Sequence, residues 1–91
     1  MTWRCVWITG ASSGIGRELA LRVARTGARV AASARTATAL EDLARLDPLI
    51  SAYPVDVTNT ADMIATAKRI EADIGPIDLD IHWITSAVVN W

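Results

Sequence analysis

Apolar and polar residues alternate along this 91-residue chain in two different periods. Short apolar runs bounded by turn residues predict four β-strands, at residues 4–9, 28–33, 50–55 and from 77 onward. Between these runs, the apolar residues recur at the three-to-four spacing that is typical of amphipathic helices. Strand and helix patterns that take turns in this way indicate an α/β fold with a parallel sheet.

The first helix is predicted at residues 14–26, with Gly27 as its C-terminal stop. Three apolar residues recur on one face of it: Ile15, Leu19 and Val23. The second helix is predicted to start near Thr38, where Glu41 completes a capping box. It ends at Asp47-Pro48, because the residue before a proline avoids the helical conformation.

The third helix is predicted at residues 60–74, with Asn59 and Asp62 capping its start and Gly75-Pro76 ending it. Its apolar stripe has four members: Met63, Ala67, Ile70 and Ile74. We expect this helix to cover the same face of the sheet as the first helix.

A glycine-rich segment joins the first strand to the first helix. It reads Thr-Gly-Ala-Ser-Ser-Gly-Ile-Gly and contains Gly10, Gly14 and Gly16. The first glycine allows a sharp turn out of the strand, the second a close approach to a pyrophosphate, and the third tight packing of the helix. The N–H groups at the helix start then face an anion. The spacing predicts a nucleotide phosphate cradle, and the alternative is a glycine-rich turn without a ligand.

This segment resembles the glycine motif of the short-chain dehydrogenase/reductase (SDR) family. Two further motifs resemble the family: Asp56-Val57 after the third strand and Gly75-Pro76-Ile77-Asp78 before the fourth. The resemblance runs from about Trp3 to Leu79. It implies a partial Rossmann fold, a doubly wound parallel sheet in the order 3-2-1-4 truncated after the fourth strand. We therefore expect residues 1–91 to form one N-terminal dinucleotide-binding half-domain. Pro54 fits that order, since the third strand lies at a sheet edge.

The cofactor expected from the second strand is NADP(H) in preference to NAD(H). NAD-binding folds usually carry an acidic residue about 20 residues past the glycines. Here Arg35 lies 19 residues after Gly16, and no acid appears before Glu41. An arginine at this position resembles NADP-preferring members of the family, and its planar fork suits a 2′-phosphate. The alternative is a solvated loop charge.

The resemblance implies further cofactor contacts by Ser12, Ser13 and Ile15, beside the three glycines. It also implies an adenine contact, in which the Asp56 carboxylate accepts from the exocyclic amine and the Val57 amide meets the ring. Each polar position has a structural alternative. The serines can cap the first helix, and the negative charge of Asp56 can interact favourably with the dipole of the third helix, which follows it.

The groups that carry out SDR chemistry do not appear in the chain. The family uses a Tyr-x-x-x-Lys pair and a serine, whereas Tyr53 is followed four residues later by Val57. Residues 80–91 also diverge from the Asn-Asn-Ala-Gly that the family places after the fourth strand. There, Asp80 and His82 share one face of a strand that should be buried. We predict no catalytic residue and no metal site.

The resemblance thus implies an NADP(H)-binding N-terminal fragment of an oxidoreductase of alcohols or carbonyls, without catalysis by itself. The alternatives are a non-catalytic nucleotide-binding module and a gene remnant without function. A fold that binds S-adenosylmethionine is a weaker rival, because it would place an acid at the position of Arg35.

Composition narrows the possible partners. The net charge of −1 offers no basic patch for nucleic acid, and no apolar stretch is long enough for a membrane helix. The single cysteine, Cys5, cannot form an internal disulfide, and no secretory signal is seen, so we expect a cytoplasmic protein. The open edge of a truncated fourth strand predicts self-association.

Overall fold

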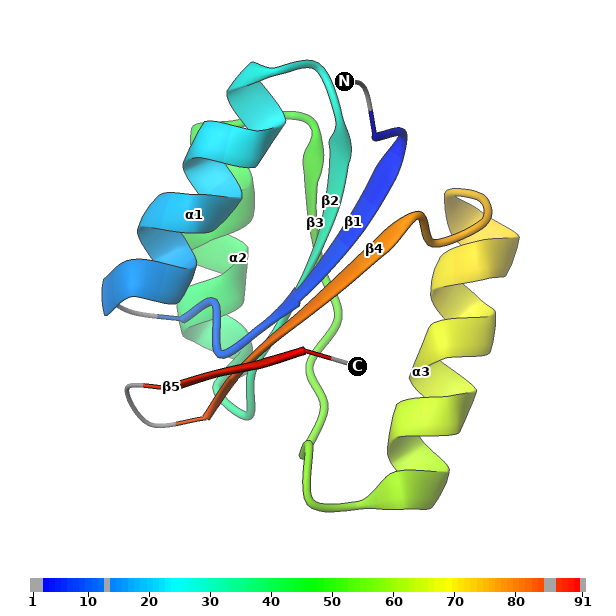
Figure 1. The fold of residues 1–91 in the computed structure, drawn as a ribbon. Helices are drawn as coiled ribbons and strands as arrows, with labels where there is room; N and C mark the ends of the chain where they lie inside the picture. Colours follow the sequence, from blue (N-terminus) through cyan, green and yellow to red (C-terminus); the bar gives the residue numbers. More distant parts are fainter. Residues whose placement is uncertain (1–2, 13, 85–86, 91) are drawn as a thin grey trace.

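The computed structural model describes residues 3–12, 14–84 and 87–90. The elements follow one another in the order β1 (Cys5–Thr9), α1 (Gly14–Arg25), β2 (Arg29–Ser33), α2 (Ala37–Leu46), β3 (Ile50–Ala52), α3 (Thr60–Asp73), β4 (Leu79–Ile84) and β5 (Ala87–Asn90) (Figure 1). In the part of the chain described, no helix is long and apolar enough to cross a membrane.

The strands form one sheet in the order β3-β2-β1-β4-β5. β1 pairs in parallel with β2 on one side and with β4 on the other, and β2 pairs in parallel with β3. The predicted α/β fold and the order 3-2-1-4 are therefore confirmed. The sheet continues into β5, which pairs antiparallel with β4, with Ile81 opposite Asn90.

β1 is buried along its whole length, because helices cover both faces of the sheet. Successive side chains of a strand point to opposite faces. Val6 and Ile8 therefore pack on one side with the buried residues of α1 and α2. Cys5 and Trp7 pack on the other side with Ile70 of α3.

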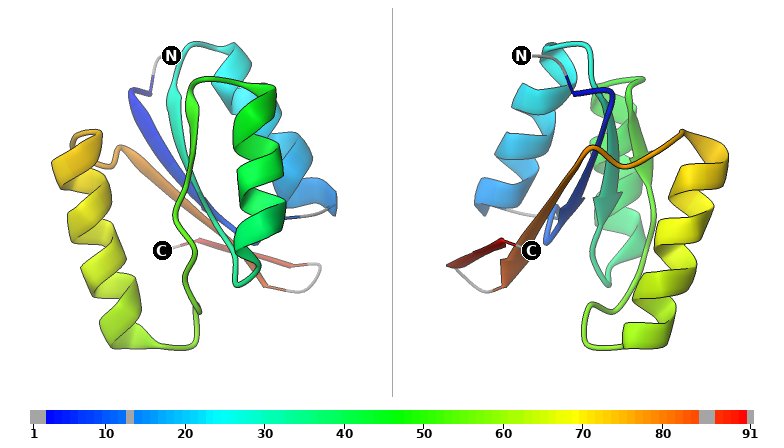
Figure 2. Two further views of the ribbon diagram at one scale, coloured as in Figure 1. Left: turned by 180° about the vertical axis from the view of Figure 1, so that it is seen from behind. Right: turned by 45° about the vertical axis from the view of Figure 1, so that its right-hand side comes forward.

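The helices are divided between the two faces of the sheet. α1 and α2 lie on one face and α3 lies on the other, as the two views of Figure 2 show. The expectation that the first and third helices share a face is therefore wrong. Parallel crossovers are right-handed. The crossovers from β1 to β2 and from β2 to β3 move in one direction along the sheet, whereas the crossover to β4 runs back past β1. Its helix must then lie on the opposite face.

Two predicted helix starts have different outcomes. At α3, the Asn59 side chain accepts a hydrogen bond from the Asp62 amide at 3.1 Å, as predicted. At α2, the helix begins at Ala37 with Thr36 as its N-cap, and the Thr36 side chain makes no capping bond. The capping box of Thr38 and Glu41 is therefore wrong, because both residues already lie inside the helix.

β3 is an edge strand, and its hydrogen bonding continues past Ala52. The amide of Tyr53 donates to the carbonyl of Ala32 at 2.8 Å, and the amide of Val55 donates to the carbonyl of Ala34 at 3.1 Å. Pro54, which has no N–H, falls between these two donors, where its nitrogen faces away from β2. This confirms the edge position that the proline predicted.

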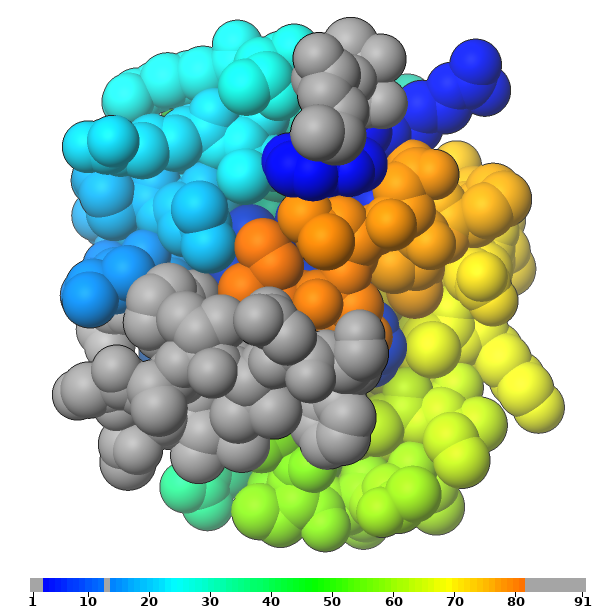
Figure 3. All heavy atoms as spheres, viewed as in Figure 1, coloured from blue at the N-terminus to red at the C-terminus, as the bar shows by residue number. Residues whose placement is uncertain are grey.

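The outer edge of β4 differs from the expectation. It is not open, because the backbone of β5 pairs with it from Ile81 to Ile84. On the face shown in Figure 3, residues 77–81 lie between the side of α1 and the side of α3. β5 is now the edge strand on this side of the sheet, and self-association stays a prediction. The side chains of residues 82–91, including His82, lie outside the part that the structure describes.

Candidate functional site

The predicted cofactor residues follow the carboxyl ends of neighbouring strands. Because β1, β2 and β3 are parallel, their carboxyl ends meet at one edge of the sheet, at the bottom of Figure 1. Gly10 follows β1 directly, Arg35 follows β2 by two residues, and Asp56 follows the extended end of β3. Ligands of open α/β sheets bind at this edge.

The glycine segment turns sharply between β1 and α1. Gly10 and Gly14 have φ angles of 69° and 60°, a region that residues with a side chain rarely adopt. The amide of Ala11 donates to the carbonyl of Ser33 at 3.1 Å, which fixes the loop against the end of β2. The course of the loop is thus set by the conformations of two glycines and by one backbone hydrogen bond to β2.

Gly14 and Gly16 have opposite surroundings. A Cβ atom on Gly16 would overlap the carbonyl oxygen of Gly10 and lie 2.9 Å from its carbonyl carbon. Gly16 is therefore required for the close packing of α1 on the loop. A Cβ atom on Gly14 would meet nothing within 4 Å. The same holds for Gly27 and Gly75, so at Gly14 only the positive φ angle favours glycine.

Ile15 lies at the start of α1 and is 61% exposed. The sequence pattern predicted Ile15 in the apolar stripe of this helix, and its exposure shows that this prediction is wrong. The buried positions of α1 are Gly16, Ala20, Val23 and Ala24, so the inward face is rotated by one residue. Ser12 is half-buried, and Ser13 lies outside the described residues.

Arg35 and Asp56 lie within electrostatic reach of each other. The hydroxyl and the amide of Thr58 donate to Oδ1 of Asp56 at 2.7 and 2.9 Å. These bonds lower the pKa of the Asp56 carboxyl, and the Arg35 guanidinium lowers it further. Both side chains reach solvent, since Arg35 is exposed and Asp56 is half-buried. The site therefore presents a cation and an ionised carboxylate on two adjacent strand ends.

This arrangement can hold a phosphorylated nucleoside. Backbone N–H groups at the start of α1 and the guanidinium of Arg35 attract anions. A carboxylate such as Asp56 accepts hydrogen bonds from an amine.

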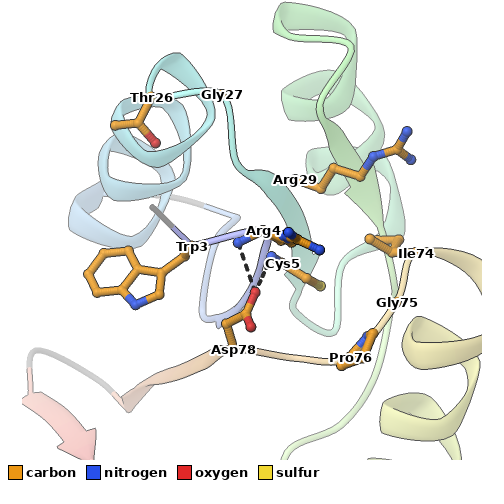
Figure 4. Close-up of a pocket in the computed structure, with 10 residues that line it drawn as sticks. All are labelled: Trp3, Arg4, Cys5, Thr26, Gly27, Arg29, Ile74, Gly75, Pro76 and Asp78. Carbon is orange, nitrogen blue, oxygen red and sulfur yellow. Dashed lines mark hydrogen bonds between the residues drawn. The ribbon is translucent and has the colours of Figure 1, made fainter. Parts of the chain in front are cut away.

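A cavity of about 680 Å³ lies at the opposite, amino edge of the sheet (Figure 4). Its lining includes Trp3, Arg4, Arg29 and Asp78. The Asp78 carboxylate accepts hydrogen bonds from the amides of Arg4 and Cys5 at 2.8 and 2.9 Å. These bonds lower the pKa of Asp78. The cavity shares no residue with the predicted cofactor site, and Asp78 holds the start of β1 in place.

Cys5 is buried beside this cavity, with 1% of its surface exposed. Burial raises the pKa of its thiol, and the nearby carboxylates of Asp78 and Glu71 raise it further. A protonated thiol is a poor nucleophile and a poor metal ligand. Cys5 is therefore a structural residue of the core that contains Trp7 and Ile70.

Tyr53, the only tyrosine, is buried between the sheet and α3. Its hydroxyl donates to Asp73 at 2.9 Å, and the Arg69 guanidinium lies 5.7 Å from its ring centre. Burial and the bond to Asp73 raise its pKa to about 12. A phenol held this way is a structural group. Its raised pKa lies further from neutral pH than that of an ordinary tyrosine, which makes it a poorer general acid.

The sequence analysis missed Ser33 as a residue of this region. Its hydroxyl accepts from Nε1 of Trp7 at 2.9 Å and donates to the carbonyl of Tyr53 at 2.6 Å. The available signal was a serine in an otherwise apolar strand, because a buried hydroxyl needs hydrogen-bond partners.

Comparisons with known proteins agree with this fold. Residues 4–82 match the model of a family described as short chain dehydrogenase. The chain is 37% identical to dehydrogenase/reductase SDR family member 7 of Mus musculus, over 90% of this chain and 27% of that protein. It is 41% identical to L-xylulose reductase of Homo sapiens, over 87% and 31%. The chain thus spans about a third or less of the curated relatives it matches.

Solved structures of short-chain dehydrogenases also superpose on this fold. A short chain dehydrogenase from Bacillus anthracis superposes with a TM-score of 0.83 at 35% identity, covering 89% of this chain and 34% of that one. A metagenomic short-chain oxidoreductase in complex with NADP superposes with a TM-score of 0.77 at 26% identity, covering 85% and 37%.

Proposed function

Since this chain belongs to the short-chain dehydrogenase family, whose members use NAD or NADP, we propose that its carboxyl sheet edge binds NADP(H). The observation that carries the proposal is the meeting of three features at one edge: the glycine loop, Arg35 and Asp56.

In this proposal the pyrophosphate lies against the segment from Gly10 to Gly16. The N–H groups of that segment and the hydroxyl of Ser13 donate to the pyrophosphate, and the hydroxyl of Ser12 donates to the 2′-phosphate. Ile15 belongs to the first turn of α1, and its exposure leaves it able to contact the cofactor.

The adenosine part is assigned to the other two strand ends. Arg35 pairs with the 2′-phosphate, which a carboxylate at that position would repel. Asp56 accepts from the adenine amine and Val57 contributes its backbone amide. The two bonds from Thr58 both use Oδ1, and among the described residues no hydrogen bond reaches Oδ2. That oxygen is therefore the acceptor we assign to the adenine.

We further propose that the chain is part of an oxidoreductase of alcohols or carbonyls, in which NADPH would supply a hydride to a carbonyl or NADP would accept one from an alcohol. Relatives named as reductases of L-xylulose and D-erythrulose support this substrate class. The 91 residues contain no Tyr-x-x-x-Lys pair, so binding without turnover is the function assigned to them. A non-catalytic nucleotide-binding module is the second candidate, and a cytoplasmic location stays a prediction.

The test is calorimetric titration of the 91-residue chain with NADP and with NAD. We expect Arg35→Asp to weaken NADP binding by the loss of a charge-assisted contact, roughly 1.5–3 kcal/mol. NAD binding should change much less. Arg29→Asp is the matched control, because Arg29 is also exposed and stands at the other end of the same strand. Equal losses for NADP and NAD, or no binding of NADP to the unmodified chain, would refute the proposal.

A further inference from the structure

Ser33 joins three separate segments at the carboxyl end of β2. Its carbonyl accepts from the Ala11 amide of the glycine loop at 3.1 Å. Its hydroxyl accepts from Nε1 of Trp7 on β1 at 2.9 Å and donates to the carbonyl of Tyr53 at 2.6 Å. Ser33 is 0% exposed, Trp7 is 3% exposed and Tyr53 is 5% exposed. These bonds are therefore shielded from competing water.

The residues on either side of Ser33 are also fixed. The amide of Tyr53 donates to the carbonyl of Ala32, and the amide of Val55 donates to the carbonyl of Ala34. Arg35 is the next residue and is exposed. The backbone that leads into Arg35 is thus held against β3 on one side and against the glycine loop on the other.

We propose that Ser33 is a positioning residue of the cofactor site, which sets the place of Arg35 relative to the glycine loop. The inference rests on the proposed function, in which these two groups hold different phosphates of one cofactor. A single oxygen both accepts from Trp7 and donates to Tyr53. An alanine can do neither, so its introduction removes the two side-chain bonds that tie the end of β2 to Trp7 and Tyr53, while the backbone bonds of β2 remain.

A positioning role predicts a selective effect on ligands. NADP and NAD share the pyrophosphate and the adenine, and they differ only at the 2′-phosphate assigned to Arg35. Displacement of Arg35 should therefore weaken NADP binding more than NAD binding. A residue that only stabilises the fold would weaken both ligands alike.

The experiment titrates Ser33→Ala with NADP and NAD and measures its unfolding in urea. We expect the NADP preference, the ratio of the two dissociation constants, to fall by about fivefold or more, the lower end of usual coupling between sites. Tyr53→Phe is the matched control. It removes the hydroxyl that donates to Asp73, yet it keeps the backbone carbonyl that Ser33 uses. Its ratio should stay at the value of the unmodified chain.

A second variant covers the case in which Ser33→Ala does not fold. Trp7→Phe removes the indole donor and leaves the Ser33 hydroxyl bonded to Tyr53. It should lower the NADP preference in the same direction by a smaller factor. An unchanged preference in both variants, while Arg35→Asp abolishes it, would overturn the positioning role and leave the proposed function standing. No preference in the unmodified chain would overturn both.

Discussion

Gly16 and Gly10 lie in direct backbone contact, so that any Cβ atom on Gly16 would overlap the Gly10 carbonyl oxygen. We expect Gly16→Ala to lower the free energy of unfolding by about 3 kcal/mol, the upper end of the usual cost of overpacking. The cost is high because the obstacle is backbone, which cannot turn away as a side chain can. Urea denaturation of the two proteins measures the difference.

Gly14→Ala is the control for that experiment. Its new methyl group would meet nothing within 4 Å, so only the φ angle of 60° is unfavourable. The strain of an alanine in that region is roughly 1–2 kcal/mol. If Gly16→Ala were no more destabilising than Gly14→Ala, the close contact between α1 and the loop would be contradicted.

Asp78 should make the stability of the protein depend on pH in the acidic range. The amides of Cys5 and Arg4 donate to its carboxylate and lower its pKa in the folded state. A lowered folded pKa means that this stabilisation is present above the unfolded value of about 3.9 and is lost as the pH falls through the folded pKa.

The measurement compares Asp78→Asn with the unmodified protein by urea denaturation across this range. The difference in unfolding free energy should be largest at neutral pH and should shrink below pH about 4. Asp42→Asn, which removes an exposed ion pair with Arg45, should give a small difference. A difference for Asp78→Asn that does not change with pH would count against the assigned bonds.

Tyr53 should titrate far above an ordinary tyrosine. Its folded pKa is raised to about 12, first by burial and then by the bond to Asp73. The neutral phenol is the favoured form, so its stabilisation is complete below pH about 10 and is lost as the pH rises toward 12. Ultraviolet absorbance can follow this directly, because the chain has one tyrosine.

The control for this titration is Asp73→Asn, which replaces the charged acceptor by a neutral one. Its midpoint should move back toward the ordinary value of about 10, which the unfolded chain should also show. A native midpoint already at the ordinary value would show that the hydroxyl is neither buried nor bonded to Asp73.

The 91-residue chain should show no turnover with alcohols or ketones in the presence of NADP or NADPH. It carries no Tyr-x-x-x-Lys pair, and Tyr53 is held by Asp73 with a raised pKa. Steady-state assays over a substrate panel test this, with L-xylulose reductase as the positive control. Cofactor-dependent rates that persist through repeated purification would contradict it.

Much of this fold could be predicted because local and long-range signals agree. The apolar strands and helical stripes indicate the α/β fold. The order 3-2-1-4, which the resemblance to the family implies and Pro54 fits, is the order that the structure has. The face occupied by α3 was assigned wrongly, since it depends on the direction of each crossover along the sheet and not on any residue of the helix. The pairing of β5 with β4 depends on backbone contacts that have no signature in the side-chain pattern.

In the site, too, some residues could be identified from the sequence and others could not. Residues whose role follows from backbone geometry, such as Gly10 and Gly16, could be identified from spacing alone. Ser33 could not, because its importance comes from Trp7 and Tyr53, which are 26 and 20 residues away in the chain. Ile15 was placed in the core because helical periodicity fixes the stripe only to within about one residue.

The central place of β1 has a consequence for synthesis on the ribosome. β1 is translated first, but one of its two neighbours, β4, begins only at Leu79. At bacterial or eukaryotic elongation speeds, roughly 4–15 seconds separate the two strands. During that interval a nascent chain that has formed β1, β2 and β3 presents an apolar strand edge, a surface that invites pairing with other chains. Until β4 leaves the ribosome and pairs with β1, this edge is a binding site for chaperones that recognise extended apolar segments.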